Sequence, residues 1–111
     1  MGKTSNTGVV QTLTTFTTPI EEGRFVKPSG ALCGAGELAG GVSMNTVDSE
    51  SKTLSICCTG IVPVTAGGTC TIDGKAGSDA NGKAVDYTTG EVLGIFFDSG
   101  SADEKVRVLL K

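Results

Sequence analysis

The sequence contains no histidine, no excess of basic residues and no long apolar run, and each absence argues against a class of function. Without histidine the commonest general base and metal ligand is missing, and no Cys-x-x-Cys pair replaces it. A net charge of −3 provides no basic footprint for nucleic acid. No apolar run approaches the roughly 18 residues of a membrane span. We therefore expect no catalytic residues, no cofactor, no metal, no nucleic-acid partner and no membrane partner.

Large side chains are also scarce. Aromatic residues make up 5% of the 111 residues, whereas glycine occurs 17 times, so the core must be built from small side chains and oligomerisation would help to stabilise it. Cys57 and Cys58 are neighbours and would point to opposite faces of a strand. With Cys33 and Cys70, they are interpreted as free thiols that pack as small apolar groups.

Short apolar segments separated by glycine-containing turns follow Arg24, at intervals typical of a small all-β barrel or sandwich. Pro63 cannot donate a ladder hydrogen bond, so we expect LSICCTG and IVPV to be separated by a bend near Gly60. Turns are predicted where Asp, Asn and Gly cluster, with these turn-forming residues: Asp73, Gly74, Asn81 and Gly82.

The stretch GSDANGKA, residues 77–84, fits the phosphate-binding loop pattern G-x-x-x-x-G-K-[ST] except at its last position. Ala84 lacks the hydroxyl that would bind magnesium, and Asp79 places a negative charge inside the loop. No helix is expected to follow. We therefore interpret Asn81-Gly82 as a tight turn between two strands.

The N-terminal segment MGKTSNTG lacks the apolar centre of a signal peptide, so we expect synthesis in the cytoplasm. The following stretch, VVQTLTTFTTPI, is Thr-rich and extended but does not alternate cleanly between apolar and polar residues. It either joins the domain's own sheet or adds to a partner's sheet edge. We expect residues 1–18 to form a flexible, extended N-terminal arm and residues 19–111 a single β-rich domain.

The second half of the chain, from GIVPVTAGGTCTIDGKAGSDANGKAVDY to GEVLGIFFDSGSADEKVRVLL, resembles the capsid cement, or head decoration, proteins of tailed bacteriophages. The resemblance implies a compact β-clip or β-tulip body, a homotrimer, and a location on the outer capsid surface of the virion, after synthesis in the host cytoplasm. It implies that the protein binds the major capsid protein and stabilises the capsid against the pressure of packaged DNA. By position, the arm residues that would bind the capsid are Val9, Val10, Leu13 and Phe16.

A second function remains open at this stage, namely a small β-rich module on a virion that binds carbohydrate or a host surface. Such a module would display aromatic side chains that stack on sugars. The chain offers Tyr87 and four phenylalanines for this purpose.

Overall fold

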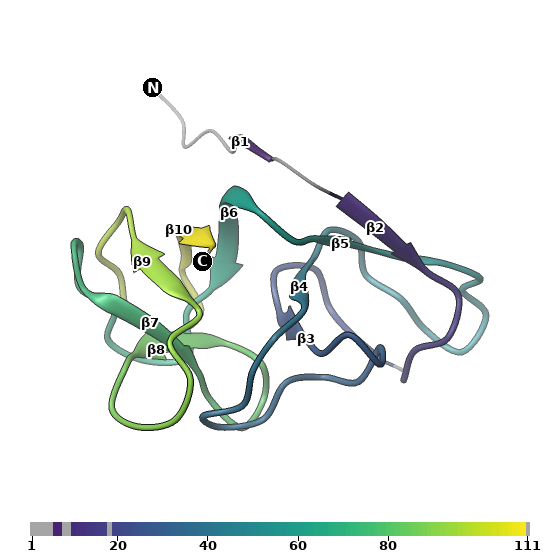
Figure 1. Ribbon diagram of the computed structural model, residues 1–111, viewed down its shortest axis with the longest axis horizontal. Helices are drawn as coiled ribbons and strands as arrows, with labels where there is room; N and C mark the ends of the chain where they lie inside the picture. The colour runs from purple at the N-terminus through teal and green to yellow at the C-terminus, as the bar shows by residue number, and fades with distance from the viewer. Residues whose placement is uncertain (1–5, 8–9, 18, 111) are drawn as a thin grey trace.

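The fold is an all-β sandwich of two open antiparallel sheets, as the sequence predicts (Figure 1). The computed structural model describes residues 6–7, 10–17 and 19–110. In the large sheet the strand order is β1-β6-β10-β9-β7-β8, and in the small sheet it is β2-β5-β4-β3. The strands are β1 (Asn6–Thr7), β2 (Val10–Leu13), β3 (Phe25–Val26), β4 (Gly41–Ser43), β5 (Leu54–Cys57), β6 (Gly60–Thr65), β7 (Lys75–Ser78), β8 (Ala84–Asp86), β9 (Gly94–Phe96) and β10 (Lys105–Leu110).

Most of the core lies between the two sheets. Phe25 and Val42 of the small sheet pack in one buried cluster with Val64, Phe96 and Val108 of the large sheet. A second cluster contains Ile20, Val26, Val47, Leu54 and Ile56, with Leu13 and Phe16 packed against it. Each fully buried valine, leucine or phenylalanine contributes about 1.5–3 kcal/mol, so these two clusters provide the main hydrophobic stabilisation of the domain.

β5 and β6 lead from the small sheet into the large one. Gly60 has a φ of 98°, a left-handed conformation that suits glycine, and it forms the bend that the sequence predicts there. Pro63 of β6 is opposite Arg107 of β10. The Arg107 carbonyl points to the other side of β10, where it accepts a hydrogen bond from the N–H of Phe97, directly after β9. The Pro63 nitrogen therefore points away from β10, so its missing N–H removes no hydrogen bond between β6 and β10.

The N-terminal segment pairs with both β6 and β5, and the register is the same in the two ladders. Asn6 and Thr7 pair with Ile61 and Gly60, and Val10–Leu13 pair antiparallel with Leu54–Cys57. β1 is thus the edge of the large sheet and β2 the edge of the small one. Over residues 10–13 the segment adopts the first of the two alternatives, pairing with the domain's own sheet.

Candidate interaction surfaces

Residues 77–84 form a β-hairpin, with β7 pairing antiparallel with β8. The Asp79 carboxylate Oδ1 accepts hydrogen bonds from the backbone N–H groups of Asn81, at 2.8 Å, and Lys83, at 2.9 Å. In a phosphate-binding loop such N–H groups would face the phosphate. Here the loop's own carboxylate occupies them. Gly82 has a φ of 74°, and its carbonyl accepts a 2.7 Å hydrogen bond from the Phe25 N–H, which fixes the hairpin against β3.

Two other turns have the same backbone conformation and form an internal repeat. In TIDGK (71–75) Asp73 has a φ of 70°, and in SADEK (101–105) Asp103 has the same φ. Each segment closes with a backbone bond between its fourth and first residues, Gly74 to Thr71 and Glu104 to Ser101, and its fifth residue, Lys75 or Lys105, begins a strand. In the first turn the left-handed residue is therefore Asp73, and Gly74 is the residue after it.

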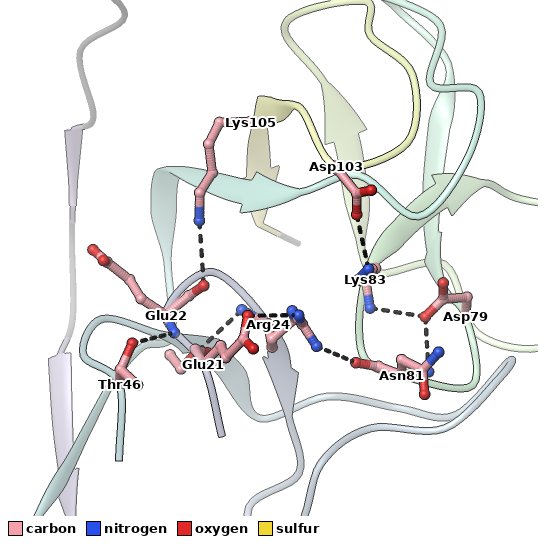
Figure 2. A network of polar contacts seen from close by, with 10 residues as sticks. Glu21, Glu22, Arg24, Thr46, Asp79, Asn81, Lys83, Asp103 and Lys105 are labelled. Atoms are coloured by element: carbon pink, nitrogen blue, oxygen red, sulfur yellow. Dashed lines mark hydrogen bonds and ion pairs between the residues drawn. The ribbon is translucent and has the colours of Figure 1, made fainter. Parts of the chain in front are cut away.

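A polar network joins the loops at one side of the sandwich (Figure 2). The Arg24 guanidinium donates to the Asn81 carbonyl at 3.2 Å and forms an ion pair with Glu21 at 2.9 Å. Lys105 donates to the Glu22 carbonyl at 3.2 Å. The network lines an open groove of about 660 Å³, in which the basic groups already have protein partners. We interpret it as a connection between segments distant in sequence.

Replacing Lys83 with alanine is expected to change stability by less than about 1 kcal/mol. Its ammonium pairs with Asp103 at 3.0 Å, and the Asp103 side chain is 79% exposed, so water screens the pair. Denaturant unfolding would measure this change. A thermal shift with ATP and magnesium, present in the parent and lost in Lys83→Ala, would contradict the hairpin interpretation.

The cysteines are free thiols. Cys33, Cys57 and Cys70 are buried in the main core, whereas Cys58 packs against the second cluster, so the adjacent pair does point to opposite faces. Burial raises the pKa of Cys70 to about 11, with the nearby Asp86 adding to the effect, and burial also raises the pKa of Cys33. The Cys33 and Cys70 thiols therefore stay protonated at neutral pH, and all four cysteines pack as small apolar groups.

Within the described ranges, no three His, Cys, Asp or Glu side chains gather closely enough to hold a metal ion. The described residues include no helix of the length and apolarity that crossing a membrane would require. What remains as candidate sites are two surfaces that suit macromolecular contact: an open sheet edge and an apolar sheet face.

The open edge belongs to β1 and β2. Loops hydrogen-bond the free edges of the other two terminal strands: Cys33 donates to Phe25 of β3, and Asp86 of β8 donates to Thr69. Across residues 10–13, the backbone bonds found within the described part of the chain lie on the β5 side alone. The outer side of β2 is therefore free to accept another strand.

The structure separates the proposed arm residues. Val10 is 45% exposed on the edge strand, whereas Leu13 and Phe16 are half-buried against the second core cluster. Val9 lies outside the described residues. The backbone of β2, more than its apolar side chains, is therefore the part of the arm presented to a partner.

The apolar face is the outer side of the large sheet. Antiparallel sheets with one face in water normally alternate apolar and polar residues, with the polar ones outside. Here Ile61, Leu109 and Ile95 form a row across three strands, with Lys75 next in the row on β7. Pro63 and Phe97 lie beside them, both exposed. Such a row is unusual on a solvated face, which makes this face a candidate contact surface.

Arg107 lies between Pro63 and Phe97 on this face and is neutralised there. Its guanidinium binds the Asp98 carboxylate in a bidentate arrangement at 3.0 and 3.2 Å, and its backbone N–H donates to the same carboxylate at 3.0 Å. This pairing raises the pKa of Arg107. The apolar face therefore contains a positive group whose charge is balanced locally.

Two open antiparallel sheets packed face to face place the chain structurally among the small β-sandwiches. One solved structure with the same fold is the head fiber gp8.5 N base of bacteriophage phi29, at a TM-score of 0.78, with 93% of this chain and 95% of that chain covered. Sequence identity is 12%, so the likeness shows the fold alone. No family model matches the chain, and no curated protein matches it.

Proposed function

We propose that the chain is a structural protein of a tailed-bacteriophage virion that binds the outer surface of the assembled capsid and stabilises it against DNA pressure. The observation that carries this proposal is the fold shared, over nearly the whole chain, with a protein described as the base of a phage head fiber. The resemblance of residues 60–110 to head decoration proteins supports the same role. The proposed partner is the major capsid protein, and the proposed assembly of the chain is a homotrimer.

We assign the capsid contact to the open edge of β1 and β2. Residues 4–20 contain no charged side chain. Soluble proteins usually protect an exposed edge with lysine, proline or a covering loop, and among the described residues none of these lies over β2. An extended capsid segment added to this edge would gain main-chain hydrogen bonds along it.

The register identifies a backbone group for this contact. The Ser55 carbonyl accepts a 2.8 Å hydrogen bond from Met44 N–H, so the backbone polar groups of Ser55 point to β4. Thr12 is opposite Ser55 on the other side of β5. In an antiparallel pair the opposed residues either exchange both bonds or neither, so the Thr12 N–H points outward.

Replacing Thr12 with proline is expected to weaken capsid binding at least tenfold while the domain stays folded. Proline removes the outward N–H and is tolerated on an edge strand. Thr12→Val is the matched control, because it alters the side chain and keeps the N–H. The measurement is titration of capsids prepared without this protein, with circular dichroism as a check of folding. Equal affinity for the proline variant and the parent would contradict the assigned edge.

The proposed function itself is tested by the parent protein on the same capsids. We expect saturable density at fixed lattice positions and greater resistance of the filled capsids to heat. Absence of bound density at saturating protein would overturn the proposal.

The alternative of a carbohydrate-binding module has less support from the aromatic residues. Phe25 and Phe96 are buried, and Tyr87 is half-buried with its hydroxyl donating to the Gly90 carbonyl at 3.1 Å. Phe97 is exposed, but it belongs to the apolar face. The sites for stacking a sugar ring are therefore few.

A further inference from the structure

A largely apolar groove lies at one end of β9 and β10. It consists of two adjoining hollows that share Val92 and Leu110, with volumes of about 300 and 260 Å³. Glu91 lines the first hollow, whereas Lys75 lines the second together with Ile95 and Leu109. The groove thus has an apolar centre and one residue of each charge in its two halves.

Neither of these two charges has a partner among the described residues. In the described part of the chain, no ion pair or side-chain hydrogen bond is found for the Lys75 ammonium or the Glu91 carboxylate. Other basic side chains do pair, in the following ion pairs: Arg24–Glu21, Lys27–Glu37, Lys83–Asp103 and Arg107–Asp98. Lys75 and Glu91 are therefore available to pair with charges on another molecule.

We infer that this groove is the surface through which copies of the chain associate, with Lys75 of one copy beside Glu91 of the next. The inference rests on the proposed function, because that function includes an oligomer. It adds which surface of the chain forms the contact between copies. In a closed cyclic oligomer the same contact repeats around the axis. A residue on one side of the interface surface therefore meets a residue on the other side of that surface in the next copy. A groove with an apolar centre and opposite charges in its halves is complementary to itself in that arrangement.

The adjoining surface supplies the rest of such an interface. The row from Ile95 through Leu109 to Ile61 continues the groove onto the apolar face. Interfaces commonly have an apolar core with a polar rim, and a stable one buries about 800 Å² per partner. The apolar face beside the groove provides the core, and Lys75 and Glu91 provide the rim.

The test is sedimentation of the free protein over a range of concentrations, without capsids. We expect the parent to sediment as a closed oligomer and Ile95→Glu to sediment as a monomer. Ile72→Glu is the matched control, because Ile72 is 50% exposed, against 45% for Ile95, and it lines neither hollow. Circular dichroism of each variant would show that the fold is retained.

A charge exchange tests the ion pair separately. Lys75→Glu and Glu91→Lys should each raise the dissociation constant at least tenfold, and the double variant should restore it. A monomeric parent, equal effects of Ile95→Glu and Ile72→Glu, or a double variant no tighter than either single one would overturn the inference. Capsid binding is not measured in this experiment, so its outcome is distinguishable from failure of the proposed function.

Discussion

Replacing Gly82 with valine is expected to lower the free energy of unfolding by about 4 kcal/mol, from backbone strain and overpacking together. Gly82 has a φ of 74°, which a β-branched residue adopts only at high cost. A Cβ there would also lie 2.8 Å from Leu32 Cδ1 and 2.9 Å from the Phe25 carbonyl oxygen. The hairpin would have to move away from β3, and the hydrogen bond between Phe25 and Gly82 would be lost.

Urea unfolding measures this change, and Gly68→Val serves as its control. The neighbour nearest to a Cβ at Gly68 is Val85 Cγ1, at an ordinary contact distance of 3.7 Å. We expect the control to cost less than about 1 kcal/mol, as surface substitutions usually do. Similar costs for the two variants would show that the close approach of the hairpin to β3 does not contribute to stability.

Deleting residues 1–18 is expected to lower the free energy of unfolding by a similar amount, about 4 kcal/mol, and the thermal midpoint by about 15 °C or more. The deletion removes β2, which pairs with β5, and it removes Leu13 and Phe16 from the second core cluster. Leu54 and Ile56 would then be exposed along a new edge.

Differential scanning calorimetry measures the effect of this deletion. A variant lacking residues 1–5 is the control, because it retains both β1 and β2. A freely attached arm would leave the midpoint unchanged, and that result would contradict the packing of residues 10–17 on the domain.

The sequence predicts the all-β class and several turns because these depend on local chemistry. Glycine at Gly60 and Gly82 suits a left-handed backbone, and Pro63 indicates where a ladder bond is absent. The partner of the N-terminal strand is not local. Its pairing with β5 joins residues that lie more than 40 positions apart, so the Thr-rich stretch is compatible with the domain's own sheet and equally with a foreign one.

The apolar face was also beyond prediction. Ile61, Ile95 and Leu109 are apolar, and so are the buried residues next to them in the sequence, Val62, Phe96 and Val108. The alternation of apolar and polar residues that would show which side of each strand faces water is therefore missing. The repeat of TIDGK and SADEK is similarly hidden, since the two segments share few residues and become alike only in backbone conformation. Both features depend on which strands become neighbours.

The single register of the N-terminal segment with β5 and β6 has a consequence for synthesis of the protein. Residues 6–13 leave the ribosome before their partners, which follow roughly 40 to 55 residues later, a delay of about 2 to 11 seconds at ordinary rates of translation. During that interval a charge-free, β-prone strand is exposed on the nascent chain. Neighbouring nascent chains on the same messenger present the same strand, so the yield of folded protein should fall as translation becomes slower or more crowded.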